Sequence, residues 1–136
     1  MCGIAGAIWT RPELAIEPPV LARMTETLRH RGPDDQGLYQ ESYRLRPPYE
    51  AQPGIALGHR RLSIIDVASG HQPLANENET IWTVFNGEIY NFADLRRRLE
   101  GSGHRFRTNS DTETIVHLYE DEGPTCFEHL AGMFSI

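Results

Sequence analysis

Apolar residues near the start of the chain predict a strand and then a helix. The run Gly3–Trp9 (GIAGAIW) is apolar but rich in small residues, which suits a buried strand better than a surface helix. Leu21, Met24 and Leu28 then recur at helical spacing behind a pair of prolines, and proline is well tolerated in the first turn of a helix. We expect this helix to end before Gly32.

Strand-like segments dominate the middle of the chain. The candidate strands are residues 38–39, 55–59, 61–65 and 81–85. Asn86-Gly87 follows the last of these segments directly, and this dipeptide is the strongest local signal for a β-hairpin with a tight type I′ turn. The sequence therefore predicts a hairpin that turns at Asn86 and Gly87.

Two amphipathic helices are predicted after this turn. Asn91 can cap a helix in which Leu95 and Leu99 face the same way. Ser110 and Glu113 have the spacing of a capping box ahead of a second apolar stretch, so we expect Ser110 to begin another helix.

The order of these elements indicates the fold class. A short helix is expected after Pro124, and residues 132–136 look like the opening of a further strand, so we expect the domain to continue beyond it. The strands come in adjacent groups joined by short turns rather than alternating with helices. This order predicts an α+β fold with antiparallel pairing.

Composition narrows the class of protein. The chain has 136 residues, which suits one domain, and 39% of them are apolar, which is enough for a core and excludes wholesale disorder. Thirteen basic and 19 acidic residues give a formal charge of −6, so binding to nucleic acid or to an anionic membrane has no general electrostatic support. No apolar run approaches the ~20 residues that span a bilayer, and no secretory leader is visible, so we expect a cytoplasmic protein.

Cysteine and histidine usage predicts neither disulfides nor a metal site. Cys2 and Cys126 form no disulfide framework, and the six histidines are scattered along the sequence without a closely spaced pair. Cys126 lies near a predicted helix and is expected in the core.

Cys2 is the first candidate for chemistry. Removal of Met1 would leave a thiol and a free α-amine on one residue, and both groups ordinarily titrate near the pH of a cell. A nucleophile and its base would then be held together by covalent geometry. On this residue alone the alternative stays open that Cys2 is a small buried side chain of the first strand. If Met1 is retained, the nitrogen is an amide and the proposed base is lost.

Several motifs together add a family resemblance that covers the whole chain. They are M-C-G-I-A-G at residues 1–6, R-G-P-D-D at 31–35, H-R-R-L-S-I-I-D at 59–66, G-H-Q-P at 70–73, N-G-E-I-Y-N at 86–91 and S-D-T-E at 110–113. With them the sequence resembles the N-terminal glutaminase domain of glutamine-hydrolysing asparagine synthetases, which are class II glutamine amidotransferases. Other amidotransferases of this class share the leading Cys-Gly-Ile and an Arg-Gly-x-Asp, so they remain an alternative.

The resemblance implies an N-terminal-nucleophile hydrolase fold, a four-layer sandwich of two antiparallel sheets between helices. It makes residues 1–136 an incomplete type 2 glutamine amidotransferase domain that releases ammonia from L-glutamine and needs no cofactor of its own. A C-terminal synthetase domain, expected to follow, would use ATP and magnesium to convert aspartate and this ammonia to asparagine. We expect weak or no glutaminase activity from residues 1–136 alone, and the oligomeric state stays open.

The resemblance also implies catalytic roles. Cys2 would attack the amide carbon and form a γ-glutamyl thioester, while its α-amine carries the proton to the departing ammonia. The side-chain amide of Asn86 and the backbone N–H of Gly87 would stabilise the oxyanion.

Substrate-binding roles follow in the same way. Arg61 would hold the α-carboxylate of glutamine as a planar fork, with the adjacent Arg60 as the alternative. Asp111, helped by Glu88, would receive the α-ammonium group. Backbone groups at Leu62, Ile64 and Ile65 would complete this site.

Arg31 and Asp34 are further candidates, and two other functions remain as alternatives. Arg31 and Asp34 would either brace the site or only hold their own turn. A non-catalytic glutamine-binding module would keep the charged residues of the site without the nucleophile. A papain-like cysteine hydrolase would need a histidine partner for Cys2, for which His59 and His71 are candidates.

Overall fold

The N-terminal part of the chain forms a three-stranded antiparallel sheet. The structure, a computed structural model, describes residues 2–43, 52–62 and 70–136. The strands are β1 (Gly3–Trp9), β2 (Asp35–Ser42) and β3 (Gly54–Arg61), in the order β1-β3-β2. β3 is therefore the central strand, and it is paired antiparallel on both sides.

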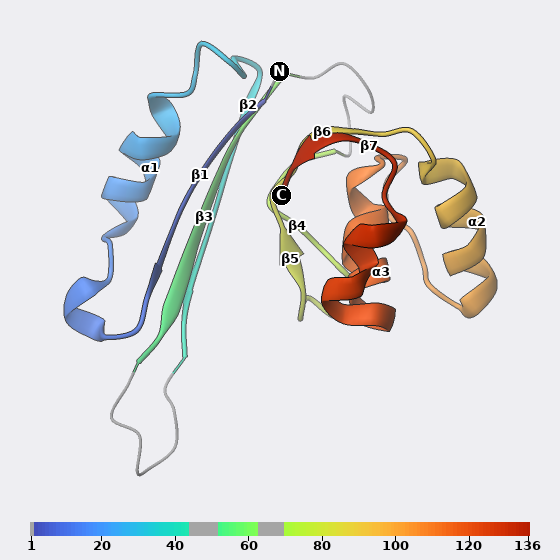
Figure 1. The fold of residues 1–136 in the computed structure, drawn as a ribbon. Helices are drawn as coiled ribbons and strands as arrows, with labels where there is room; N and C mark the ends of the chain where they lie inside the picture. Colours follow the sequence, from blue (N-terminus) through green and yellow to red (C-terminus); the bar gives the residue numbers. More distant parts are fainter. Residues whose placement is uncertain (1, 44–51, 63–69) are drawn as a thin grey trace.

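One face of this sheet is covered by α1 (Pro18–Glu26), which follows the short 3₁₀ helix η1 (Pro12–Leu14) (Figure 1). Leu21 of this helix forms a small core with Trp9 and Ala56 of the sheet. Helix and sheet approach closely at Gly58, where an added Cβ would lie 2.0 Å from Oγ1 of Thr25. The absence of a side chain at this point of β3 therefore sets how near α1 can pack.

The rest of the chain forms two short strand pairs and two helices. The elements are β4 (Leu74–Ala75), β5 (Trp82–Thr83), β6 (Asn86–Ile89), α2 (Phe92–Ser102), α3 (Thr112–Glu122), the 3₁₀ helix η2 (Gly123–His129) and β7 (Gly132–Ser135). β4 pairs with β5 and β6 pairs with β7, both antiparallel. Figure 1 shows these pairs on the side of the first sheet that faces away from α1, with α2 and α3 beyond them.

A second core lies among these later elements. Its buried members are Phe85, Ile89, Leu95, Leu99, Ile115, Leu118 and Cys126. The predicted apolar faces of α2 and α3 are thus the faces that pack, and Cys126 is a core residue as expected. The mixture of helices with antiparallel strands confirms the predicted α+β class.

The first strand has the predicted limits but is less buried than expected, and the first helix ends before Leu28. β1 is an edge strand of its sheet, so it is only partly buried, and Ile8 is 81% exposed. α1 ends at Glu26, and turns continue the chain to Arg31. Of the segment predicted as a strand at 61–65, the structure describes only Arg61 and Leu62. No helix of the described residues is long and apolar enough to cross a membrane.

The hairpin prediction at Asn86-Gly87 is wrong. Both residues belong to β6, which pairs with β7 more than 40 residues later, so that Gly87 lies opposite Phe134. A type I′ turn needs positive φ at both central residues. Within the described part of the chain, positive φ occurs only at Glu79, Gly103 and Gly123. Packing of the neighbouring apolar residues against α2 and α3 has overridden the local turn signal.

The capping box at Ser110 is also wrong. The carboxylate of Glu113 accepts hydrogen bonds from the backbone N–H groups of Arg107 and Thr108, both at 2.7 Å, instead of reaching back to Ser110. Oγ of Ser110 accepts a longer bond of 3.2 Å from the N–H of Thr112. Glu113 therefore fixes the loop that precedes α3 rather than the first turn of the helix.

Asn91 lies at the N-terminal end of α2 as predicted, but its side chain does not cap the helix. Its Nδ2 donates to the carbonyl of His129 at 2.9 Å, and its Oδ1 accepts from the N–H of Ala131 at 3.0 Å. Asn91 therefore ties the start of α2 to the segment that leads into β7.

Candidate active site

A pocket of about 470 Å³ lies where the end of β3, the β6–β7 pair and the start of α3 meet. Seven of its lining residues are candidates from the sequence: Cys2, Arg61, Leu62, Asn86, Gly87, Glu88 and Asp111. Ile64 and Ile65 lie outside the described residues. The fold therefore brings together four separate segments of the chain at one cavity.

Cys2 lies just before β1 and is half-buried, with a free thiol. Its Sγ is 4.0 Å from the carbonyl oxygen of Leu62, and its own carbonyl accepts a 3.0 Å hydrogen bond from Nε of Arg31. The backbone N–H of Asp34 donates to the carbonyl of Arg61 at 3.0 Å. Arg31 and Asp34 thus contact pocket residues from outside the pocket, and a bracing role for them stays a prediction.

Only one of the two neighbouring arginines lines the pocket. Arg61 does, and it is 7% exposed. The guanidinium group of Arg60 instead donates to the carbonyls of Gly32 at 2.8 Å and Pro33 at 3.3 Å, and it is paired with Glu26 at 3.4 Å. Successive side chains of a strand point to opposite faces, which explains why the two differ.

Asn86 and Gly87 are presented to the pocket by β6. A Cβ at Gly87 would lie 2.2 Å from the carbonyl oxygen of Met133 and 2.5 Å from Cα of Phe134, so only glycine fits beside β7. Met133, Phe134 and Ser135 of β7 line the same pocket. The candidate oxyanion residues are therefore positioned by pairing with a distant strand and not by a turn.

Phe85, directly before Asn86, is held through both its backbone N–H and its backbone carbonyl. Its N–H donates to Oε1 of Gln72 at 2.6 Å, and its carbonyl lies 3.0 Å from Nε2 of His59. Nε2 of Gln72 also reaches Oγ1 of Thr112 at 3.3 Å. Sequence reasoning missed this role of Gln72, although the residue stands in the G-H-Q-P motif.

His59 is a structural residue and not a partner for Cys2. It is 1% exposed, it is not among the pocket-lining residues, and its Nε2 carries the hydrogen that the Phe85 carbonyl accepts. Burial lowers the pKa of His59 to about 4, although the hydrogen bond to Phe85 opposes the shift. The ring is therefore neutral near pH 7. His71 instead contacts Asp35, with Nδ1 2.6 Å from Oδ2.

Asp111 lies at the start of α3 and joins it to β6. Its Oδ2 accepts a 2.9 Å hydrogen bond from the N–H of Ile89. Among the described residues that line the pocket, the charged side chains are the arginine Arg61 and the carboxylates Glu88 and Asp111. A pocket with one cationic and two anionic side chains can complement a ligand that carries both a carboxylate and an ammonium group.

A family model described as a glutamine amidotransferase domain matches residues 1–136. The chain belongs to this family. It is 37% identical over 137 residues to the glutamine-hydrolysing asparagine synthetase 3 of Bacillus subtilis (strain 168) and 43% identical over 135 residues to the glutamine-hydrolysing asparagine synthetase 1 of Arabidopsis thaliana. A third relative is the glutamine-hydrolysing asparagine synthetase of Asparagus officinalis, at 42% identity.

These matches cover 99% of the chain but only about a fifth of each relative, 20% in the bacterial protein and 21% in the two plant proteins. The amidotransferase domain described here therefore corresponds to a small part of the relatives that it matches. Its pocket is lined by Cys2, Asn86, Gly87 and Asp111, which come from separate segments of the chain.

Two histidines that lie far apart in the sequence lie together in this amidotransferase domain. The ring centroids of His104 and His117 are 4.8 Å apart. Glu77 and Glu120 lie beside them, and the four residues could together hold a metal ion. Twelve residues lie between the two histidines, and helix α3 with the loop before it brings them into contact, which no short motif could indicate. None of the four lines the pocket.

Proposed function

We propose that this chain is the glutaminase domain of an asparagine synthetase and hydrolyses the side-chain amide of L-glutamine to glutamate and ammonia. One observation carries the proposal. The segments that contain residues 2, 61–62, 86–88 and 111, far apart in sequence, line the same pocket with a thiol, a cation and two carboxylates. The family match and the glutamine-hydrolysing relatives support the same function.

The nucleophile of the proposed reaction is the thiolate of Cys2. Its sulfur adds to the amide carbon of glutamine, the C–N bond then breaks, and nitrogen leaves as ammonia with a proton delivered by the α-amine. The thioester that remains is cleaved by water, which supplies oxygen to the glutamate product and returns a proton to the thiol. The α-amine is free only after Met1 has been removed, so processing of Met1 is part of the proposal.

Stabilisation of the oxyanion is assigned to Asn86 and Gly87. Their strand is held by β7 on one side and by the contacts of Phe85 with Gln72 and His59. Fixed donors of this kind stabilise the tetrahedral intermediate without reorganisation, and loss of one typically costs about 10²–10³ in rate.

Selection of glutamine is assigned to the three charged pocket residues. Arg61 pairs with the α-carboxylate, while Asp111 and Glu88 receive the α-ammonium group. The Asp111 carboxylate is oriented by the N–H of Ile89, so the ammonium group meets an acceptor that is already fixed.

The proposal extends to the fold and to the whole protein. The order of helix, sheet, strand pairs and helices in Figure 1 is consistent with part of an N-terminal-nucleophile hydrolase sandwich of four layers. We place residues 1–136 in a type 2 amidotransferase domain of a cytoplasmic protein. Its partner would be a synthetase domain that uses ATP and magnesium to join the ammonia to aspartate. The length of the relatives supports such a partner.

Covalent labelling with an electrophilic glutamine analogue tests the function. We expect one adduct per chain, located on Cys2 by peptide mapping, and protection by excess glutamine. Buried Cys126 is the internal control and should remain unmodified. The intact mass of the unlabelled protein shows whether Met1 is absent.

Variants separate the outcomes of this experiment. Cys2→Ala should abolish labelling and ammonia release but retain glutamine binding by calorimetry, while Asp111→Asn should weaken binding and labelling together. Labelling at another residue would contradict the proposed reaction, and so would measurable ammonia release that persists unchanged in Cys2→Ala. Glutamine binding with no labelling and no turnover in a chain that has lost Met1 would instead indicate a binding module.

A further inference from the structure

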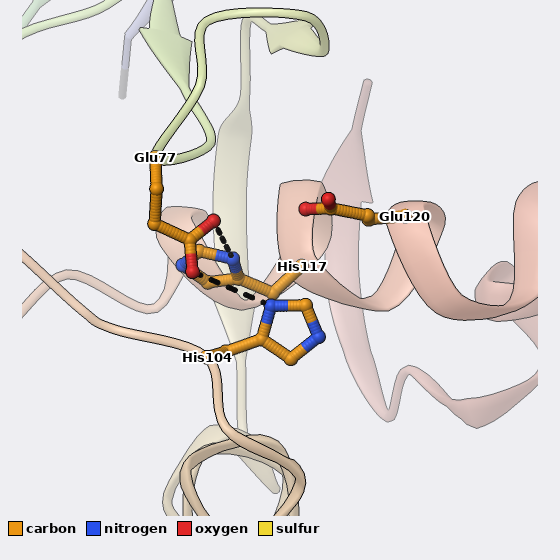
Figure 2. A group of neighbouring side chains, drawn as sticks. All are labelled: Glu77, His104, His117 and Glu120. Atoms are coloured by element: carbon orange, nitrogen blue, oxygen red, sulfur yellow. Dashed lines mark ion pairs between the residues drawn. The ribbon is translucent and has the colours of Figure 1, made fainter.

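A second group of polar side chains lies away from the pocket. Glu77 lies in the connection between β4 and β5, His104 in the connection between α2 and α3, and His117 and Glu120 in α3 (Figure 2). One nitrogen or oxygen from each residue lies within 4.8 Å of the corresponding atoms of the other three. Figure 2 shows the two imidazole rings against the carboxylate of Glu77, with the carboxylate of Glu120 turned toward them.

Two distances within this cluster are close to those between atoms that share a metal ion. Nδ1 of His104 is 3.5 Å from Oε1 of Glu77, and Nδ1 of His117 is 3.3 Å from Oε2 of Glu77. Charge-assisted N–H···O bonds are shorter, about 2.7–2.9 Å. Ligand atoms at the corners of a tetrahedral zinc site, with bonds of about 2.0–2.1 Å, are separated by about 3.3–3.4 Å.

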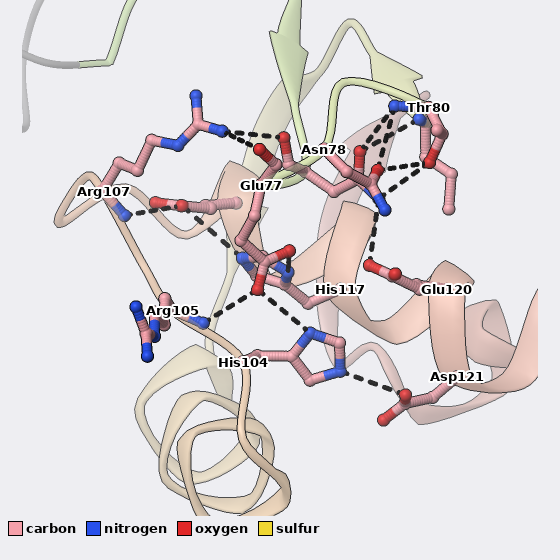
Figure 3. Close-up of polar contacts among 12 residues, drawn as sticks. Glu77, Asn78, Thr80, His104, Arg105, Arg107, His117, Glu120 and Asp121 are labelled. Atoms are coloured by element: carbon pink, nitrogen blue, oxygen red, sulfur yellow. Dashed lines mark hydrogen bonds and ion pairs between the residues drawn. The ribbon is translucent and has the colours of Figure 1, made fainter.

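The ring of His104 is oriented as metal-bound imidazoles are, and the ring of His117 makes only a longer contact on the corresponding side. Nε2 of His104 is 3.0 Å from Oδ1 of Asp121, and Nε2 of His117 is 3.5 Å from Oε1 of Glu113 (Figure 3 shows the contact of His104 with Asp121). A histidine ligand ordinarily turns its second nitrogen to a carboxylate in this way, which leaves the first nitrogen with a lone pair for the metal. In His104 and His117 the nitrogen available to a metal is Nδ1, and both Nδ1 atoms face Glu77.

That arrangement is unfavourable without a positive charge at its centre. A lone pair on Nδ1 that faces a carboxylate oxygen is repelled by it. His117 is fully buried, and among the described residues neither of its ring nitrogens has a partner with hydrogen-bond geometry. A buried polar group without a hydrogen bond is costly, and coordination of a cation removes that cost.

Nearby arginines do not neutralise the cluster. Arg105 contributes its backbone N–H to Oε1 of Glu77 at 2.9 Å. The guanidinium group of Arg107 donates to the backbone carbonyls of Asn76 at 3.2 Å and Glu77 at 2.6 Å, not to a carboxylate of the cluster (Figure 3). The two imidazoles are therefore surrounded by the carboxylates of four residues, which favours a divalent cation. These residues are Glu77, Glu113, Glu120 and Asp121.

We propose that Glu77, His104, His117 and Glu120 form a structural zinc site, separate from the glutamine pocket. Two imidazole nitrogens with two carboxylate oxygens are a donor set for zinc, whereas magnesium and calcium take oxygen ligands. Glu120 is exposed and gives the ion a way in, and Nδ2 of Asn76 orients its carboxylate at 2.9 Å. Small rotations of the side chains close the remaining distance to the ion.

The site would attach two connections of the chain to α3. One is the β4–β5 connection, and the other is the segment between α2 and α3. α3 begins at Thr112, directly after Asp111, and both residues line the glutamine pocket. Bound zinc is therefore expected to raise the melting temperature and to support the element that carries Asp111, without touching substrate.

Calorimetric titration of the protein with zinc chloride, after removal of metals with a chelator and dialysis, tests the site. We expect one zinc ion per chain and a higher melting temperature with zinc. His104→Gln and Glu77→Gln should weaken zinc binding by at least about 100-fold, and Asp121→Asn, which removes only the outer contact of His104, by about 10–100-fold. Cobalt in place of zinc should give the visible absorption of a tetrahedral site.

Matched variants control for binding elsewhere. His129 is an exposed histidine paired with Glu122 at 2.8 Å outside the cluster, so His129→Gln should leave zinc binding unchanged. Cys2→Ala should also leave it unchanged, since zinc binds free thiols readily. The melting temperature without metal shows whether each variant is folded. If a buried position does not tolerate substitution, the exposed variant Glu120→Gln tests the site instead. Its amide oxygen can still accept the hydrogen bond from Asn76, so the fold should be kept while zinc binding weakens.

Three results would overturn the proposal. They are no zinc uptake by the metal-free protein, uptake that is lost in Cys2→Ala, and equal affinity in His104→Gln and His129→Gln. The last two would place the ion elsewhere. The first would mean that the four residues do not bind zinc.

Discussion

The side chain of Gln72 accepts a 2.6 Å hydrogen bond from the backbone N–H of Phe85 and so fixes the start of the strand that presents Asn86. The other end of the same side chain reaches Thr112 at the beginning of α3. One amide therefore links two walls of the pocket, the β6 wall with Asn86 and the α3 wall with Asp111. Both ends are buried, so water cannot substitute for either contact.

Replacement of Gln72 by methionine should impair the pocket with little change in volume. The variant leaves the N–H of Phe85 buried without an acceptor, which typically costs about 1–3 kcal/mol of unfolding free energy. We expect a lower urea midpoint and slower labelling of Cys2 by the glutamine analogue. Gln40→Met is the control, because Gln40 donates to Ile16 far from the pocket. Equal labelling rates in the two variants would contradict a positioning role for Gln72.

Alanine at Gly87 should disrupt the pairing of β6 with β7. The new Cβ would overlap the backbone of Met133 and Phe134, so the strands must separate and both stability and labelling should fall. Gly101 is the matched control: it lies within α2 with no atom within 4 Å of an added Cβ, and alanine there should stabilise by about 0.5–1 kcal/mol. Urea unfolding of both variants tests whether the two changes in unfolding free energy have opposite signs. Stabilisation by Gly87→Ala would refute the predicted clash.

The two neighbouring arginines should respond differently to lysine. Arg61→Lys removes a planar fork from the pocket, and we expect glutamine to bind about 10–100-fold more weakly, measured by calorimetry in the Cys2→Ala background to prevent turnover. Arg60→Lys loses carbonyl contacts at Gly32 and Pro33, so it should reduce stability with little change in affinity. The reverse pattern would assign the carboxylate to Arg60.

Acid should destabilise the fold through His59. Its pKa is about 4 in the folded protein because it is buried, against 6.5 ordinarily, so the unfolded chain binds the extra proton first. The stabilising effect of a neutral His59 is thus complete above pH 6.5 and is lost as the pH falls toward about 4. Between pH 6.5 and about 5 this amounts to about 2 kcal/mol.

Comparison with His59→Gln isolates this effect, because the amide can still donate to the Phe85 carbonyl but does not titrate. Urea unfolding across this pH range should give a flatter profile for the variant. Asp35 and Glu113 titrate at lower pH: burial would raise the pKa of each, but their hydrogen bonds lower both below the ordinary values. Identical slopes for the two proteins would show that His59 does not carry the acid sensitivity.

Local sequence patterns predicted the helices better than the strand pairing. Leu95 and Leu99 pack as their spacing indicated, because the apolar face of a helix is set by residues three and four apart. Pairing depends instead on distant partners. Asn86-Gly87 has the chemistry of a turn, yet β7 and the core around Phe85 hold it extended. Glu113 failed as a capping residue for a similar reason, since the loop at Arg107 and Thr108 competes for its carboxylate.

In the pocket, too, the sequence indicated some residues and not those whose role depends on distant partners. Motifs named its reactive and charged side chains, and the structure brings the described ones together apart from Arg31 and Asp34, which contact Cys2 and Arg61 from behind. The motifs did not indicate which residues hold the pocket in shape, although Gln72 itself stands in one of them. Gln72 and the side chains of β7 act through contacts with backbone far away in sequence, which spacing along the chain does not reveal.

The wall formed by β7 has a consequence for synthesis of the protein. Translation delivers the cysteine at position 2 first and Phe134 more than 130 residues later, yet both face the same cavity. A nascent chain therefore exposes its thiol long before it can enclose an amide. The cavity therefore gains its last wall only when β7 has been synthesised and has paired with β6.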